Sequence, residues 1–288
     1  MIPDGYHRCD PLRTFDGSTQ GDWDANDHLL DERGRFVMTM GALLVELPGG
    51  QRALIDVGFG PRTVILADLG MEFWGGRLLS SLATIGLAPD DIDAVLYSHL
   101  HVDHVGWTTK RTDGSLTFSR ARHVMARAEW EHWSSSSDEG GPSSADTAAL
   151  EERVELIDGE STVLPGITIT PTFGHTPGHC SFIVSSGTKR AVVLGDAVHC
   201  PLQISHPEWA FTADVNPQAA KDAREQMLRE LDAPHTAFVG AHFSRAVFGR
   251  VLPGTVPRQV GFDVAVAAAP QLVAAEAPAG EVFLPPLT

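Results

Sequence analysis

Four side chains of the kind that bind metal ions stand within six positions of this chain, directly after a short apolar segment at 93–98. They are His99, His101, Asp103 and His104. Alternate side chains of an extended chain point the same way, so the first three can converge on one point just past the strand end. His104 can turn toward a second point if a helix begins there. A single histidine in such a place is usually structural, but a cluster this dense predicts a metal site.

Three more candidate ligands follow strand-like segments farther along the chain. They are His175 after 167–172, Asp196 after 191–194, and His242 after 236–240. In α/β proteins, active sites are commonly assembled beyond the ends of strands. Five imidazoles and two carboxylates suit two divalent cations, and zinc accepts both kinds of ligand while leaving a position for water. The sequence therefore predicts two bound metal ions, with zinc favoured.

Hydrophobic patterning predicts an α/β domain over residues 36–262, between an irregular N-terminal segment at 1–35 and an Ala- and Pro-rich tail at 263–288. Strands are expected at 36–47, 53–57, 93–98, 122–126, 154–157, 167–172, 181–184, 191–194 and 236–240. Helices are expected at 74–85, 129–133 and 217–231, the last with Asn216 as N-cap. The low-complexity stretch 134–146 predicts a mobile loop.

Charge, apolar runs and cysteine content limit the kinds of molecule that this chain is expected to bind. There are 37 acidic against 21 basic residues and the net charge is −16, so the surface repels phosphate backbones and no nucleic acid is expected. No apolar run of about 18 residues and no signal core at the N-terminus are present, so a cytoplasmic protein without a membrane partner is expected. Cys9, Cys180 and Cys200 form no CxxC pair, which disfavours a disulfide framework. A small-molecule substrate is expected instead, and a homodimer is compatible with the sequence.

The pattern His-x-His-x-Asp-His at 99–104, followed in order by His175, Asp196 and His242, resembles the metallo-β-lactamase superfamily over roughly residues 36–245. The resemblance implies a four-layer αβ/βα sandwich with the metals at one edge between two mixed sheets. It implies three ligands for a first metal (His99, His101, His175), three for a second (Asp103, His104, His242), and Asp196 as a bridge. It also implies that Asp56 supports the site through hydrogen bonds to the ligands.

Details of the motifs separate the branches of this superfamily. His101 stands where the oxygen-reducing flavodiiron branch has glutamate, and true β-lactamases lack a bridging carboxylate such as Asp196. The acidic composition disfavours the RNA-cutting branch. The segment GDAVHCPLQ at 195–203 is similar to the GDxxHxxxQ pattern of YtnP-type quorum-quenching lactonases and of methyl parathion hydrolase. Two positions depart from the relatives: Trp107 replaces a glycine, and His199 stands where better-known lactonases carry a tyrosine.

The resemblance implies a hydrolase in which a metal-bridging hydroxide attacks the carbonyl of a lactone or carboxylic ester. Asp103 and His199 are the candidate catalytic residues, because either can pass a proton to the leaving alkoxide. For His199 the alternative is that it only packs behind Asp196. Four aromatic residues are candidates for an apolar substrate pocket, although each alone is more often part of a core: Trp74, Trp107, Trp209 and Phe243.

Other activities stay open at this point. Thioesterases of the glyoxalase-II kind and phosphotriesterases use the same metal ligands. A more distant alternative is a metal-dependent oxidoreductase with one iron, which two zinc ions per chain would exclude. A third class is a binding module on a degenerate hydrolase fold, and the complete ligand set argues against it.

Overall fold

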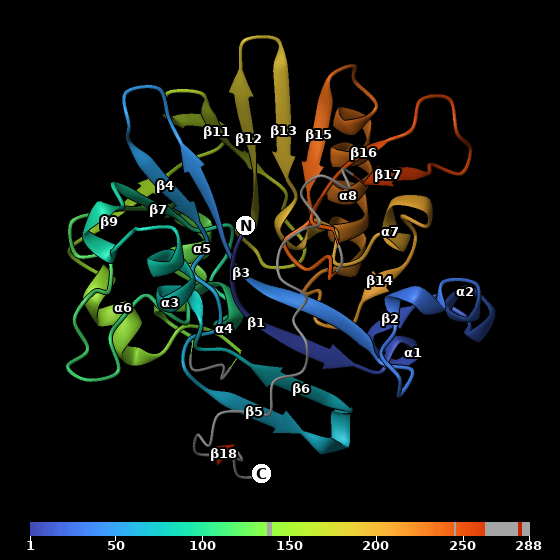
Figure 1. Ribbon diagram of the computed structural model, residues 1–288, viewed down its shortest axis with the longest axis horizontal. Helices are drawn as coiled ribbons and strands as arrows, with labels where there is room; N and C mark the ends of the chain where they lie inside the picture. Colours follow the sequence, from blue (N-terminus) through green and yellow to red (C-terminus); the bar gives the residue numbers. More distant parts are fainter. Residues whose placement is uncertain (137–139, 245, 263–281, 284–288) are drawn as a thin grey trace.

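The computed structural model describes residues 1–136, 140–244, 246–262 and 282–283, and it contains two large sheets (Figure 1). The nine-stranded sheet has the order β18-β5-β6-β1-β3-β4-β7-β8-β9, and the seven-stranded sheet has the order β10-β11-β12-β13-β15-β16-β17. Strands β14 and β2 form a small third sheet.

The first sheet comprises β1 (Ile2–Cys9), β3 (Phe36–Glu46), β4 (Arg52–Ile55), β5 (Thr63–Leu66), β6 (Met71–Trp74), β7 (Ala94–Leu96), β8 (Arg122–Ala126), β9 (Val154–Ile157) and β18 (Val282–Phe283). The second comprises β10 (Ser161–Leu164), β11 (Ile167–Pro171), β12 (Cys180–Ser186), β13 (Lys189–Val193), β15 (Thr236–Val239), β16 (Phe248–Val251) and β17 (Val260–Phe262). The third comprises β2 (Phe15–Asp16) and β14 (Ala210–Phe211). The α-helices are α1 (Pro11–Thr14), α2 (Gln20–Asp24), α3 (Leu78–Thr84), α4 (Val102–Val105), α5 (Arg127–Ser134), α6 (Ser144–Leu150), α7 (Leu202–Ser205) and α8 (Pro217–Leu231). The short 3-10 helices are η1 (Asp27–Leu29), η2 (Ala67–Leu69), η3 (Pro89–Asp91) and η4 (Gly195–Ala197).

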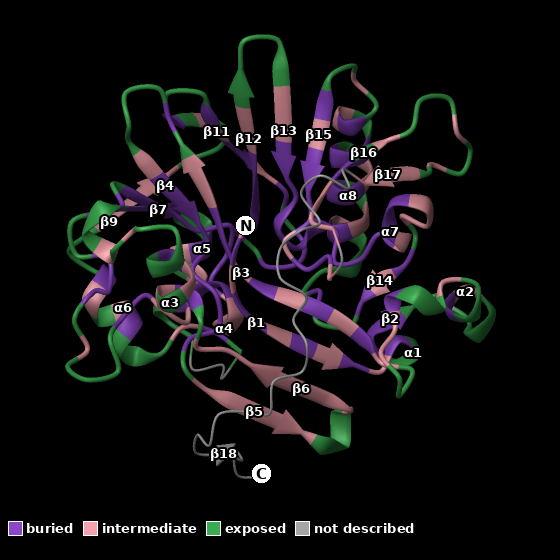
Figure 2. Cartoon of the chain, in the orientation of Figure 1, coloured by how far each residue is buried: buried purple, intermediate pink, exposed green. Residues whose placement is uncertain are grey.

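Three hydrophobic clusters separate four layers, and Figure 2 shows the buried residues concentrated where the sheets face each other. One cluster lies between the two sheets and joins residues such as Leu96 and Phe182. A second joins the nine-stranded sheet to α3, α5 and α6. A third joins the seven-stranded sheet to α8, where Phe238 meets Met227 and Leu228. The predicted four-layer αβ/βα sandwich is confirmed. No helix in the described ranges has the length and apolarity needed to cross a bilayer.

The prediction of an irregular segment at 1–35 is wrong, because its first residues form β1. This strand pairs antiparallel with β3 on one side and with β6 on the other. Its buried face carries the polar residues Asp4 and His7, and its register shifts between Pro3 and Gly5. Since burial of polar side chains and a bulge both break the alternation of apolar and polar residues, the strand has no hydrophobic signature.

The helix predicted at 74–85 begins later than expected. Trp74 ends β6, and α3 starts at Leu78 after a glycine pair. Gly76 has a φ of +118°, which interrupts any regular element there. The helix predicted at 217–231 is confirmed as α8, and the Asn216 side chain accepts a hydrogen bond from the Ala219 backbone as its N-cap.

Two expectations fall partly on undescribed residues. The tail predicted at 263–288 lies outside the described residues except for β18, which pairs parallel with β5. Of the loop predicted at 134–146, residues 137–139 lie outside the described part; helix α5 extends to Ser134, and α6 begins at Ser144.

Asp4 ties the N-terminal strand to the loops beside it. Its carboxylate is fully buried and accepts six hydrogen bonds. The donors are the backbone N–H groups of Phe59, Gly60, Gly76, Arg77 and Leu78, and the indole Nε1 of Trp107, at 2.7–3.0 Å. One side chain thereby joins β1 to the segment after Asp56, to the start of α3 and to the segment after α4.

Candidate metal centre

The predicted ligands all lie just beyond strand ends, as the sequence indicates. Four of them follow β7, and α4 begins at Val102 with His101 as its N-cap residue. The chain is extended at His101, with φ −64° and ψ 153°, and then turns helical. His104 therefore leaves the extended run and points elsewhere. His175, Asp196 and His242 follow β11, β13 and β15 of the other sheet.

Two groups of side chains form where these segments meet. In the first group, His101 Nδ1 lies 3.0 Å from His99 Nε2 and 2.9 Å from His175 Nε2. In the second group, His104 Nε2 lies 3.3 Å from His242 Nε2, and Asp103 Oδ2 lies 3.8 Å and 3.7 Å from these two nitrogens. Within each group the ligand atoms are all within 4.8 Å of one another.

Asp196 stands between the two groups and contacts both: Oδ1 faces the second group, and Oδ2 faces the first group but also lies 3.3 Å from His242 Nε2. Its Oδ2 lies 3.3 Å from His175 Nε2 and 3.8 Å from His99 Nε2. Its Oδ1 lies 3.1 Å from His242 Nε2 and 3.3 Å from His104 Nε2. A single carboxylate with this placement can contact two cations at once.

The residues fit two divalent cations. Burial, followed by the neighbouring His104, holds the pKa of His99 well below its usual value, and burial and His175 lower that of His101 to about 3. A low pKa favours the neutral imidazole, which is the form that binds a cation. At His175, burial is outweighed by Asp196 and Asp214, which raise the pKa to about 9, so a cation there would replace a proton. Asp196 Oδ1 is buried without a hydrogen-bond partner among the described residues. Facing imidazole nitrogens and an orphaned carboxylate oxygen are costly in a buried site unless a cation satisfies them.

The outer nitrogens of the histidines are also engaged. Asp56 accepts hydrogen bonds from the Ser98 backbone and hydroxyl, both at 2.8 Å, and its Oδ2 lies 2.9 Å from His104 Nδ1. His242 Nδ1 lies 2.8 Å from the Thr39 carbonyl oxygen. Such contacts set the tautomer and the orientation of metal-binding histidines.

Asp214, which the sequence analysis missed, serves His175 in the same way. Its Oδ1 lies 2.9 Å from His175 Nδ1, and its Oδ2 accepts a hydrogen bond from the Phe211 backbone at 3.1 Å. The buried guanidinium of Arg224 lies 3.7 Å from this second oxygen. No local pattern reveals Asp214, because it is 39 positions away from its partner.

We expect Asp214→Asn to lower the affinity of the chain for one metal ion by roughly 10–100-fold, the usual cost of changing a partner of a ligand. The amide keeps the size of the side chain but removes the charge beside His175. A competition titration with a chelator measures this change. Asp222→Asn on the exposed side of α8 is the matched control. Equal affinities in the two variants would contradict a role for Asp214.

His199 is almost fully buried next to Asp196. Its Nε2 lies 3.2 Å from Asp196 Oδ2, and its ring stacks on Phe211 with centroids 3.6 Å apart. Neither ring nitrogen has a hydrogen-bond partner among the described residues. The backbone N–H of His199 donates to Gln203 Oε1. His199 also forms a third ligand-spaced group with His175 and Asp196.

His179 lies behind Asp196 and helps to orient it. Its Nε2 accepts a hydrogen bond from the Asp196 backbone N–H at 2.9 Å, and its Nδ1 contacts the hydroxyl and the carbonyl oxygen of Thr172. Gly195 allows this approach, because a Cβ there would lie 2.7 Å from His179 Nε2.

The four aromatic pocket candidates occupy different environments. Trp74 stacks on Tyr6 with centroids 4.9 Å apart, and the Trp107 indole donates to Asp4. Trp209 and Phe243 are only 2% and 1% exposed and pack in hydrophobic clusters. A pocket role for them stays a prediction. The sequence analysis did not single out Phe211, whose ring stacks on that of His199.

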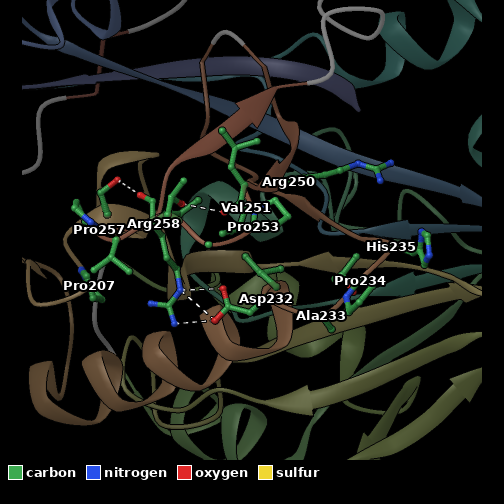
Figure 3. Close-up of a pocket in the computed structure, with 18 residues that line it drawn as sticks. Pro207, Asp232, Ala233, Pro234, His235, Arg250, Val251, Pro253, Pro257 and Arg258 are labelled. Atoms are coloured by element: carbon green, nitrogen blue, oxygen red, sulfur yellow. Dashed lines mark hydrogen bonds and ion pairs between the residues drawn. The ribbon is translucent and has the colours of Figure 1, made fainter.

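A cavity of about 750 Å³ lies elsewhere, beside α7, α8 and β16 (Figure 3). Its lining includes Asp232, Arg250 and Arg258, and an ion pair joins Arg258 to Asp232 across it. None of the predicted ligands lines it. The histidine cluster, and not this cavity, is therefore the candidate site.

Known proteins resemble this chain in sequence and in fold. An N-acyl homoserine lactonase from Bacillus sp is 26% identical over 163 residues, which are 54% of this chain and 58% of that enzyme. The chain thus spans less than two thirds of the length of this relative. The structure of AidC, described as a dizinc quorum-quenching lactonase in complex with a product, superposes with a TM-score of 0.76 at 22% identity, covering 91% of this chain and 92% of AidC. A probable metal-dependent hydrolase from Staphylococcus aureus gives 0.76 at 22% identity, covering 86% and 90%.

A family model described as the metallo-beta-lactamase superfamily matches residues 42–242. The match begins in β3, ends at His242 and includes all the clustered ligands. Because the sandwich, the order of the ligands and this match agree, the chain belongs to the metallo-beta-lactamase superfamily.

Proposed function

We propose that this protein is a two-zinc hydrolase that opens lactones or cleaves carboxylic esters. The position of Asp196 carries the proposal, because its carboxylate contacts histidines of both ligand groups. The names of the relatives, N-acyl homoserine lactonase and dizinc lactonase, support the same metals and the same bond type. Two bound zinc ions would supply an activated water and polarise the substrate carbonyl.

In this proposal Asp103 handles the proton of the leaving alkoxide. Its side chain is 14% exposed, whereas that of Asp196 is 5% exposed, so Asp103 is the ligand carboxylate that a substrate can approach more easily. Hydrolysis of a lactone or of an alkyl ester releases an alkoxide, which needs a proton. Asp103 Oδ2 lies 3.8 Å from His104 Nε2 and 3.7 Å from His242 Nε2, within the second ligand group.

The proposal is tested by elemental analysis of the protein as purified, together with a hydrolysis panel on zinc-loaded protein. The panel contains a lactone, an aryl ester, a thioester and a phosphotriester. We expect two zinc ions per chain and the highest turnover on the lactone or ester. One iron per chain, or no hydrolysis of any substrate, would overturn the proposal. A preference for the thioester or the phosphotriester would leave the two-metal part of the proposal intact but would change the proposed substrate class.

We expect His199→Ala to keep both metal ions but to lower kcat/KM. The ring has two unpartnered nitrogens beside Asp196, so one of them can hydrogen-bond the substrate oxygen or its leaving group. General acid–base help contributes about 10²–10⁴-fold. The loss should be larger for lactones, whose alkoxides need a proton, than for activated aryl esters, whose leaving groups do not.

His28→Ala, at an exposed position, is the control for this variant. Equal losses on both substrates would restrict His199 to binding. Unchanged kinetics on both would leave it a packing residue against Phe211. Loss of a metal ion in His199→Ala would instead indicate that His199 is a metal ligand, together with His175 and Asp196.

A further inference from the structure

Glu129 is a buried carboxylate next to the metal centre that belongs to neither ligand group. It lies in α5 and is 1% exposed. Its Oε1 accepts hydrogen bonds from the Leu100 backbone N–H and from the Trp133 indole, both at 2.8 Å. Its Oε2 accepts from the Thr176 hydroxyl at 2.6 Å and from the Gly178 backbone N–H at 3.0 Å. The four donors favour the charged form of this carboxylate, although burial outweighs them and raises the pKa of Glu129.

Three of the four donors come from two segments that carry ligands. Leu100 lies between His99 and His101 in the segment after β7. Thr176 directly follows His175 in the segment after β11, and Gly178 is two positions farther on. These segments belong to different sheets. A single side chain therefore accepts hydrogen bonds from both parts of the first ligand group.

Two further contacts support the place where α5 meets the two ligand-bearing segments. A Cβ at Gly178 would lie 2.0 Å from the backbone nitrogen of Glu129, so only glycine permits the approach of the two segments. The Trp133 ring, which Glu129 holds through its indole N–H, meets the His101 ring edge-on with centroids 5.5 Å apart. The first group is thus supported from behind by α5.

The second ligand group has additional contacts of its own, although Asp103 and His104 lie in the same segment as Leu100. His104 contacts Asp56, and His242 contacts the Thr39 carbonyl oxygen. Glu129 makes none of these contacts. A change at Glu129 should therefore act on one metal ion and not on the other.

We propose that Glu129 is a positioning residue that sets the geometry of His99, His101 and His175, and thereby controls the affinity of the first metal ion alone. This inference rests on the proposed two-metal function. Ligand partners of this kind typically change metal affinity by roughly 10–100-fold.

The test is a two-step competition titration of zinc-loaded wild type and Glu129→Gln with a chelator. The glutamine side chain keeps the shape of glutamate. Its NH2 group, however, replaces one carboxylate oxygen and so faces hydrogen-bond donors instead of accepting from them. We expect one of the two dissociation constants to rise roughly 10–100-fold and the other to stay within about twofold of wild type. Glu131→Gln, at an exposed position of the same helix, is the matched control.

Two milder variants apply if Glu129→Gln does not fold. Thr176→Val removes one donor from the segment of His175 and should weaken the same metal ion by a smaller factor. Trp133→Phe removes a donor that lies outside both ligand segments and should change the metal affinity less than Thr176→Val.

The possible failures are distinguishable. A wild-type chain with fewer than two zinc ions would overturn the proposed function. A wild-type chain with two zinc ions and an unchanged Glu129→Gln titration would overturn only the role of Glu129. Equal weakening of both metal ions would also overturn it, because a general loss of stability affects both groups.

Discussion

Replacing Asp196 with alanine is expected to remove at least one of the two metal ions and to reduce the proposed hydrolysis by roughly 10³-fold or more, while the fold survives. The carboxylate faces both ligand groups, so its loss weakens both ions together. Metal ions supply several kcal/mol of transition-state stabilisation, and each 1.36 kcal/mol is worth about tenfold in rate. Elemental analysis and kcat measure the two effects, and circular dichroism checks the fold.

Asp90→Ala is the control for this variant, because Asp90 is exposed and belongs to neither ligand group. A fully active Asp196→Ala protein with two metal ions would rule out Asp196 as the bridge. A variant that keeps one ion and some activity would show that a single ligand group suffices for hydrolysis.

Asp4→Ala should destabilise the protein by about 4 kcal/mol or more, a large effect for one substitution. The change leaves five backbone N–H groups and one indole without their acceptor. Each unsatisfied buried group costs about 1–3 kcal/mol, and penetrating water recovers part of the sum. We expect a fall in Tm of roughly 10 °C, measured by thermal unfolding.

Asp4→Asn tests how much of the stability depends on the negative charge of Asp4, because asparagine keeps the size of the side chain. The amide retains one acceptor oxygen but directs an N–H group toward other donors, so we expect a loss of stability between those of Asp4→Ala and wild type. Asp24→Ala at the exposed end of α2 is the control. A change of less than about 1 kcal/mol in Asp4→Ala would mean that the loops around residues 59, 76 and 107 hold together without it.

The ligands could be predicted because their signal is local. His99, His101, Asp103 and His104 stand together, and each remaining ligand follows an apolar strand that is visible in the sequence. Helix α8 was also predictable, since its N-cap Asn216 and its first proline are adjacent signals. The layer order followed from the resemblance and not from the patterns of the strands themselves.

The support around the ligands could not be predicted in the same way. Glu129 lies 29 positions from Leu100 and 47 from Thr176, and Asp214 lies 39 from His175. Such pairs leave no periodic trace, because only the tertiary fold brings them together. Strand β1 was missed for a related reason: its buried positions include Asp4 and His7, which resemble surface residues until their partners are known.

Each ligand group draws on both sheets. His99 and His101 come from the nine-stranded sheet and meet His175 of the seven-stranded sheet; Asp103 and His104 likewise meet His242. A bound cation is therefore a reversible cross-link between the two halves of the polypeptide. Metal concentration then contributes to the folding equilibrium, because an ion that binds only the assembled form stabilises it by mass action. A cell short of the metal that these groups bind would lose folded protein as well as active protein.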